Sequence, residues 1–277
     1  MNSIIKGILI CIVGALVIIN YSTFNETNRT YKILHANNMD YHMSLDNNEL
    51  LVYSKNYKLI DREKIFTDDE RILSYDTGDL NNDGHDEIVV LGRKNSSSYG
   101  NNLVIFKYNN NFEKIYTKDF SILNPWKVQI CNVDGDNVKE VSIGVYKKSK
   151  YHPVMAKRPF IYEYKNKKLF PKWRGSRLSK PFEDYIFVDV NKDNRHEIAA
   201  IELLKNGKKV FSCYKWKGFG FESIGQSKDF QDILSIEKSY ENPNEFKVLL
   251  KEHGTLVKGI VSYDNNKLVI NYENMLK

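Results

Sequence analysis

The sequence contains few cysteines, prolines and glycines for its length. Its 277 residues include three cysteines, six prolines and 15 glycines. Three scattered cysteines are too few for a disulfide framework, and Cys131 and Cys213 form no zinc or redox motif, so we expect both to be small buried strand residues. The composition also excludes a collagen-like or low-complexity chain.

Enzymatic motifs are absent as well. The sequence has no HExxH, Gly-x-Ser-x-Gly, P-loop or Cys/His pair, and its six histidines lie apart. We therefore expect a protein that is not an enzyme and that serves as a binding or scaffold module. A polysaccharide-active enzyme, either a glycan hydrolase or a lyase, remains the alternative, because paired carboxylates from distant segments are not visible in one sequence.

The residues that are present favour a folded β protein. Hydrophobic residues make up 42% of the chain and charged residues 27%, which is typical of globular domains. The 18 tyrosines and 14 phenylalanines favour strands over helices, because aromatic side chains fit the pleated surface of a sheet.

The one long apolar run lies near the N-terminus. It extends from Ile4 to Tyr21 with Lys6 as its only charge, and it could nearly cross a hydrocarbon core of about 30 Å as a helix. We expect a transmembrane helix within residues 1–22 that stays attached as a signal-anchor, and a polar linker over residues 23–30. A cleaved signal peptide is the alternative. The preceding positive charge predicts a single-pass cell-membrane protein whose C-terminal domain is extracytoplasmic.

Three segments of the chain repeat one acidic pattern. They read DLNNDGHDEI from Asp79, NVDGDNVKEV from Asn132 and DVNKDNRHEI from Asp189, and their starts are 53 and 57 residues apart. Position six is Gly84, Asn137 or Asn194, residue types that accept positive φ, so we expect a sharp turn there in every copy. An eroded fourth copy runs from residue 237 to residue 246.

A second landmark recurs between these segments. An apolar strand ends in an aromatic residue and is followed by a polar turn, around Tyr53, Tyr108, Tyr164, Trp216 and Tyr263. Each unit therefore reads as strand, acidic loop, strand, linker, strand, hairpin, strand. Four short strands in about 50 residues are typical of a propeller blade. The sequence predicts an all-β fold in which residues 31–277 form a β-propeller, with five four-stranded blades expected.

Other architectures remain open at this level. An all-β sandwich or a solenoid would use the same hairpins. The first unit is short and lacks the acidic loop, so it is either a reduced blade or part of the ring closure.

The alternating oxygen groups of the acidic segments are suited to a hard cation. Ca²⁺ accepts six to eight oxygen ligands in flexible geometry, and position seven would add a backbone carbonyl. Turns rich in Asp and Asn for purely local reasons are the alternative. The expected metal-binding positions are Asp79, Asn81, Asp83, His85 and Glu87; Asn132, Asp134, Asp136, Val138 and Glu140; and Asp189, Asn191, Asp193, Arg195 and Glu197.

The three segments resemble the Asp-x-Asn-x-Asp-Gly-x-x-Asp calcium loops of FG-GAP and VCBS repeat proteins, which also occur in integrin α subunits. The resemblance covers residues 71–229 well and the flanks weakly, and the Lys/Asn/Ile-rich composition looks bacterial. It implies a propeller that holds Ca²⁺ between two strands of a blade and serves extracellular recognition at the cell surface. Glu at position nine, Asn132 at position one and Asn at position six in two copies are departures that weaken the expected affinity.

Positive charge is concentrated in one stretch. Residues 147–180 contain 12 Lys or Arg and one acid, Glu163. Basic groups interleaved with aromatic rings bind anionic polymers, so an anionic cell-wall polymer or a surface protein is the expected partner and nucleic acid is not. A merely solvated face is the alternative. The expected ligand-binding residues are Lys157, Arg158, Trp173, Arg174 and Arg177.

Overall fold

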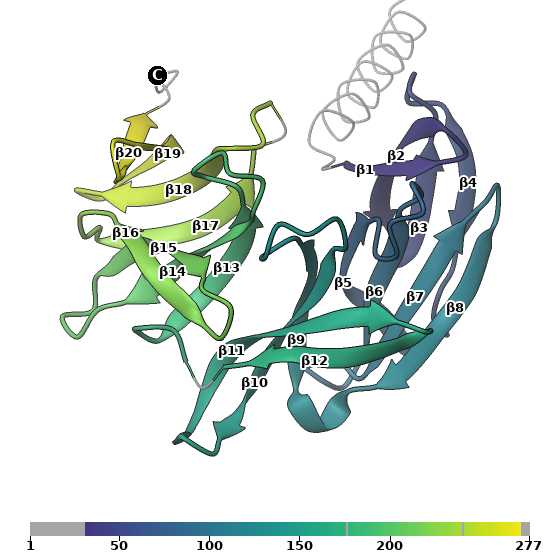
Figure 1. Cartoon of the computed structure of the whole chain (residues 1–277), viewed down its shortest axis with the longest axis horizontal. Coiled ribbons are helices and arrows are strands. Elements are labelled where there is room, and N and C mark those ends of the chain that lie inside the picture. The colour runs from purple at the N-terminus through teal and green to yellow at the C-terminus, as the bar shows by residue number, and fades with distance from the viewer. Residues whose placement is uncertain (1–30, 176, 240, 273–277) are drawn as a thin grey trace, which may run out of the picture.

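The computed structural model describes residues 31–175, 177–239 and 241–272, and these residues form a five-bladed β-propeller (Figure 1). Blade 1 contains β1 (Lys32–Ala36), β2 (Met39–Asp46), β3 (Glu49–Tyr53) and β4 (Leu59–Glu63). Blade 2 contains β5 (Glu70–Gly78), β6 (Glu87–Lys94), β7 (Asn102–Tyr108) and β8 (Phe112–Asp119). The short helix η1 (Ser121–Leu123) leads to the third blade.

The remaining blades have the same composition. Blade 3 contains β9 (Pro125–Cys131), β10 (Glu140–Ser149), β11 (His152–Lys165) and β12 (Lys168–Arg174). Blade 4 contains β13 (Phe182–Val188), β14 (Glu197–Leu203), β15 (Lys209–Trp216) and β16 (Phe221–Gln226). Blade 5 contains β17 (Asp232–Lys238), β18 (Phe246–Glu252), β19 (Thr255–Asp264) and β20 (Lys267–Tyr272).

Every blade is an antiparallel meander of four consecutive strands. The five four-stranded blades predicted from the sequence are therefore confirmed. The short first unit is a complete blade, and no blade of the described chain combines strands from the two ends of the sequence.

Asparagine pairs make the tight turns of two hairpins possible. Asn37 and Asn38 connect β1 to β2, and Asn265 and Asn266 connect β19 to β20, all with positive φ between 48° and 62°. Two-residue hairpins require positive φ at both central positions, and Asn tolerates it better than most residues. The low glycine content is thus compatible with a fold that consists of hairpins.

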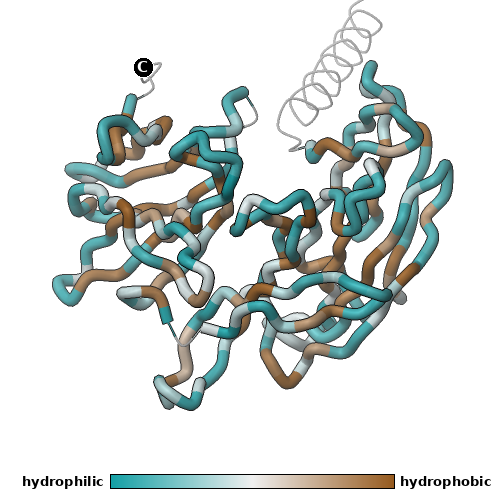
Figure 2. Tube along the Cα trace, in the orientation of Figure 1, coloured by the Kyte–Doolittle hydropathy of each residue, from teal (hydrophilic) through white to brown (hydrophobic). Residues whose placement is uncertain are grey.

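Four apolar clusters hold adjacent blades together, and the strands that supply them carry the brown, hydrophobic segments of the tube in Figure 2. They join blades 1 and 2, 2 and 3, 3 and 4, and 4 and 5, but among the described residues no such cluster joins blade 5 to blade 1. Leu234 and Leu256 of blade 5 are accordingly about half exposed, at 49% and 51%. Cys131 and Cys213 are free and fully buried in two of the clusters, as expected from the sequence.

The expected membrane anchor within residues 1–22 and the linker over residues 23–30 lie outside the described residues. Within the described part of the chain, no helix has both the length and the apolar character needed to cross a bilayer.

Candidate functional site

The three acidic segments occupy equivalent places in the propeller. The first loop (residues 79–86) connects β5 to β6, the second loop (132–139) connects β9 to β10, and the third loop (189–196) connects β13 to β14. In each case the loop joins the first strand of a blade to the second, and the glutamate at position nine begins the second strand. The eroded copy lies at the same place in blade 5, between β17 and β18.

Side-chain oxygens fold the first loop around itself. The Asp79 carboxylate accepts hydrogen bonds from the backbone N–H groups of Asp83 (3.2 Å) and Gly84 (2.9 Å). The Asn81 side-chain amide donates to Asp83 Oδ2 (3.2 Å) and to Glu87 Oε1 (3.0 Å). The Asn81 amide thereby links positions three, five and nine of the loop.

The third loop repeats this arrangement closely. Asp189 accepts from the N–H groups of Asp193 (3.0 Å) and Asn194 (2.9 Å), and Asn191 donates to Glu197 Oε1 (2.9 Å). Positions four and six have positive φ in both loops, at Asn82 and Gly84 in the first and at Lys192 and Asn194 in the third.

The second loop departs from the expected turn. Its positive φ falls at position four, on Gly135 (79°), and Asn137 at position six does not have one. The prediction of a turn at position six is therefore wrong for this copy. The reason is local. Asn132 Oδ1 accepts from the N–H of Gly135, three residues further on (2.8 Å), whereas Asp79 and Asp189 accept from N–H groups five residues further on.

The glutamates at position nine are buried, and among the described residues Glu87 and Glu197 have no ammonium in contact. Burial raises the pKa of Glu87 and of Glu197 to about 7, and that of Glu140 to about 6. Each carboxylate accepts one backbone N–H of its loop, from Leu80 (2.8 Å), Val190 (3.1 Å) and Val133 (3.1 Å) respectively. A cation beside these groups would favour their charged form.

A lysine ammonium already lies at each loop. Lys107 of β7 contacts Asp83 Oδ2 (2.6 Å), and Lys215 of β15 contacts Asp193 in the same way. These lysines are 32% and 23% exposed and each is paired with one carboxylate. Their side chains are therefore partly accessible to solvent.

The second loop holds its lysine more firmly. Lys172 of β12 is 13% exposed and contacts Asp134, Glu140 and also Glu163 Oε1 (3.4 Å). Oxygens of Asp134, Asp136 and Glu140 all lie within 4.8 Å of one another, and two of these carboxylates contact the same ammonium. Among the described residues, the carboxylates of the first and third loops do not come as close together as these three, and in the second loop Lys172 takes the place that an ion would need.

Residues at position seven contribute in different ways. The His85 ring nitrogen Nδ1 accepts from Asn37 N–H (3.1 Å) and ties the first loop to blade 1. The backbone N–H groups of His85, Val138 and Arg195 donate to the aspartate at position five of their own loop.

The structure does not gather the five expected ligand-binding residues into one patch. Arg158 is fully buried, so the expectation that it binds a surface ligand is wrong. Lys157 donates to the Glu183 carbonyl and lies over the Trp126 ring at 4.3 Å. Trp173 packs against Phe221 (5.0 Å) and Trp216 (6.3 Å) of blade 4. Arg174 and Arg177 are exposed.

The buried Arg158 organises a projecting hairpin that the sequence prediction missed. Its guanidinium donates to the carbonyls of Lys147 (2.8 Å), His152 (3.0 Å) and Val154 (2.8 Å). The tip (residues 147–155) consists of the end of β10, the turn and the start of β11, and it projects from the lower edge of Figure 1. In the sequence, this hairpin is indicated by the run of mainly charged, aromatic and apolar residues from 147 to 158.

Apolar and basic side chains are exposed together on this tip. Tyr151 is 84% exposed and Val154 55% exposed. Lys148 and Lys150 are exposed, and within the described part of the chain neither is paired with a carboxylate. Lys150 lies over the Tyr151 ring at 5.4 Å.

No protein-family model matches this sequence, and a search of curated proteins finds no match either. The resemblance to FG-GAP and VCBS repeats therefore stays a prediction.

Proposed function

We propose that the protein is a membrane-tethered, extracytoplasmic binding module whose propeller presents the β10–β11 tip to an anionic polymer of the cell wall. The observation that supports this proposal is the joint exposure of Tyr151, Lys148 and Lys150 on a projecting hairpin. Ammonium groups bind phosphate or carboxylate groups, and an aromatic ring stacks on sugar faces. The role requires no catalytic group, in agreement with the absence of enzymatic motifs.

The hairpin is held ready for binding. Arg158 holds three backbone carbonyls of the tip by hydrogen bonds, so little conformational entropy is lost when a ligand is bound. The first described strand, β1, lies at the opposite side of the view in Figure 1. If residues 1–22 are the anchor, the tip is directed away from the membrane and toward the wall.

Reversing the charge of the tip should abolish polymer binding. We expect the double substitution Lys148→Glu and Lys150→Glu to reduce retention of the full-length chain on immobilised anionic wall polymer by at least about tenfold at about 0.1 M salt, where charges are screened over about 10 Å. Tyr151→Ala should mainly reduce the preference for sugar-containing polymer over plain polyphosphate.

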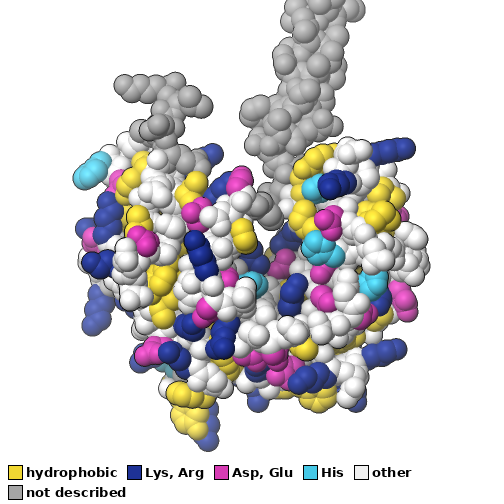
Figure 3. All heavy atoms as spheres, turned by 45° about the horizontal axis from the view of Figure 1, so that its top comes forward, with side chains coloured by type: hydrophobic (Ala, Val, Ile, Leu, Met, Phe, Trp, Pro, Cys, Tyr) yellow, Lys and Arg dark blue, Asp and Glu magenta, His cyan; other side chains and the backbone are white. Residues whose placement is uncertain are grey.

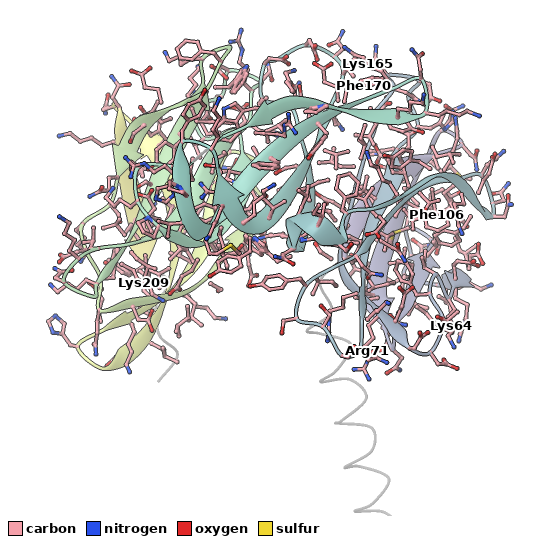
Figure 4. The ribbon with its side chains drawn as sticks, turned by 90° about the horizontal axis from the view of Figure 1, so that it is seen from below. Lys64, Arg71, Phe106, Lys165, Phe170 and Lys209 are labelled. Carbon is pink, nitrogen blue, oxygen red and sulfur yellow. The ribbon has the colours of Figure 1, made fainter. Side chains whose placement is uncertain are left out.

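The matched control uses another exposed basic turn of the same blade. Lys167 and Lys168 lie where β11 turns into β12, next to Lys165 and Phe170, which are seen at the outside of the molecule in Figure 4. Reversing these two charges should leave retention within about twofold. Equal losses for both pairs of substitutions would mean that net charge alone causes retention, and the tip would not be the site.

We further propose that the first and third loops bind Ca²⁺ in the manner of FG-GAP and VCBS repeats, with Lys107 and Lys215 displaced from Asp83 and Asp193. Support comes from the hydrogen bonds that link Asn81 to Asp83 and Glu87 in the first loop and Asn191 to Glu197 in the third, which bring these polar side chains together. The ion would provide the positive charge that the buried glutamates lack.

Calcium should raise the Tm of the full-length chain by several degrees in the millimolar range, because a ligand that binds only the folded state stabilises it. Replacing Asp79 and Asp83 by Asn should remove about half of this gain, and replacing Asp189 and Asp193 should remove the other half. Thermal unfolding in chelator and in calcium is the measurement. An identical Tm in both conditions would reduce the loops to structural turns.

A further inference from the structure

The five blades enclose a pocket on the axis of the propeller. It has a volume of about 230 Å³ and is lined by the first strand of every blade. Figure 3 shows basic and acidic side chains gathered in the hollow between the two halves of the ring. None of the predicted metal-binding or ligand-binding residues lies in this pocket, although Glu237, the first residue of the eroded fourth copy, lines it.

One acidic group of the pocket, Asp76 of β5, is already fully compensated. Its Oδ1 contacts Lys32 Nζ (2.7 Å), and its Oδ2 accepts from Ile130 N–H (2.8 Å). Burial by itself would raise the pKa of Asp76, but the ammonium groups of Lys32 and Lys238 lower it to about 2. Asp76 is therefore a charged and well-satisfied carboxylate at neutral pH.

Lys238 of β17 is the group left with an uncompensated charge. Among the described residues, Asp76 is the only carboxylate within 4 Å of its ammonium, at 3.9 Å, and no described residue accepts a hydrogen bond from it. Burial and the neighbouring Lys32 lower the pKa of Lys238. Its side chain is nevertheless 34% exposed, so a solute in the pocket can reach the ammonium.

Two other polar side chains of the pocket are already paired. Lys127 contacts Asp184 (2.7 Å) and donates to the Tyr185 carbonyl (2.8 Å), and Gln129 donates to the same carbonyl (3.1 Å). Glu237 also lines the pocket, and the apolar part of the wall includes Val128, Ile186 and Ile236. A buried cation without a close partner is costly, and a bound anion would remove that cost.

We propose that the axial pocket binds a small anion, through a carboxylate or phosphate group placed on Lys238 Nζ, with the apolar part of the ligand against the wall of Ile186 and Ile236. Lys32 supplies a second positive charge on the far side of Asp76. This site is separate from the β10–β11 tip and does not depend on the proposed binding of a wall polymer.

Inorganic phosphate and acetate are suitable probes for the full-length chain in detergent solution. We expect one binding site per chain by calorimetry for at least one of them, and a rise in Tm of about 4 °C at tenfold excess over Kd, relative to chloride of equal ionic strength. Binding of phosphate alone would identify a phosphate site, and binding of acetate alone a carboxylate site. Absence of binding beyond chloride for both probes would overturn the proposal.

Substitution tests the position of the site. Lys238→Met should lower affinity at least tenfold, whereas Lys205→Met, in an exposed turn of blade 4, should leave it unchanged. Loss of binding in the variant with both Lys148 and Lys150 reversed, but not in Lys238→Met, would place the anion on the tip and overturn the axial site.

A measurement on the unaltered protein covers the case that Lys238→Met does not fold. Saturating phosphate or acetate, whichever binds, should slow acylation of Lys238 by an amine reagent at least fivefold, as followed by mass spectrometry. Acylation of Lys205 should proceed at the same rate with and without the anion. Equal rates at Lys238 in both conditions would contradict the proposal.

Discussion

Replacing Lys172 by methionine is expected to destabilise the protein by about 3 to 5 kcal/mol, the cost of breaking a buried ion pair by removing one partner. The ammonium is 13% exposed and is shared by Asp134, Glu140 and Glu163. Glu140 is 1% exposed, so water does not replace the lost charge. Asp134 and Glu140 would then lose their cation, whereas Glu163 would keep Lys165 (2.7 Å).

Urea unfolding in the presence of chelator is the measurement. Lys168→Met lies on the same strand but is exposed, and it should change the free energy of unfolding by less than about 0.5 kcal/mol. Calcium should recover part of the stability of Lys172→Met, because the converging oxygens of the second loop would be open to an ion. A loss below about 1 kcal/mol would show that Lys172 does not compensate the second loop.

The number and order of the blades could be predicted from the sequence. The spacing of the acidic segments and of the aromatic landmarks carries the period of the fold, and hairpin connections make strands that are neighbours in sequence neighbours in space. The same spacing predicts the placement of each acidic loop between the first two strands of a blade. The lack of an apolar cluster between the described residues of blades 1 and 5 could not be predicted in this way, because the repeat pattern contains no information about closure.

The lysines at the loops were missed because they come from other strands. Glu87 is paired across the sheet with Lys107, the residue that precedes the landmark Tyr108. Lys215 likewise precedes Trp216, whereas the equivalent residue in blade 3 is Glu163, opposite Glu140. Two facing carboxylates require a cation, and Lys172 on the fourth strand provides it. The residue before each aromatic landmark is the one that lies near the glutamate at position nine, so its charge indicates whether that glutamate has a lysine or a second acid beside it.

The basic stretch shows the limit of arguments from local charge. Several of its positive charges are neutralised by acids distant in the sequence, as for Lys180 with Glu202 (3.0 Å). Arg158 is turned inward because its donors are needed by the carbonyls of the hairpin tip. Similarly, the axial pocket combines one to three residues from each of five blades, and no segment of the sequence contains enough of them to be recognised.

Replacing Asp76 by asparagine should have the second large effect, a loss of about 3 kcal/mol at neutral pH. The substitution keeps an acceptor for Ile130 N–H but removes the carboxylate that faces the ammonium groups of Lys32 and Lys238 in the pocket. Asp68→Asn is the control, because that carboxylate is 93% exposed and its loss should cost less than about 0.5 kcal/mol.

The effect of Asp76→Asn should depend on pH with a definite sign. The pKa of Asp76 is lowered from its ordinary value of 3.8 to about 2, so the unfolded chain takes up this proton first as the solution is acidified. The carboxylate therefore contributes its full stabilisation above about pH 4 and loses it as the pH falls from about 4 to 2. A shift of this size corresponds to about 2 kcal/mol, by which the difference between the two proteins should narrow over that window. Urea unfolding in chloride buffers from pH 7 to pH 2 measures the difference. A gap that stays constant or widens on acidification would mean that Asp76 is not held in its charged form by the two lysines.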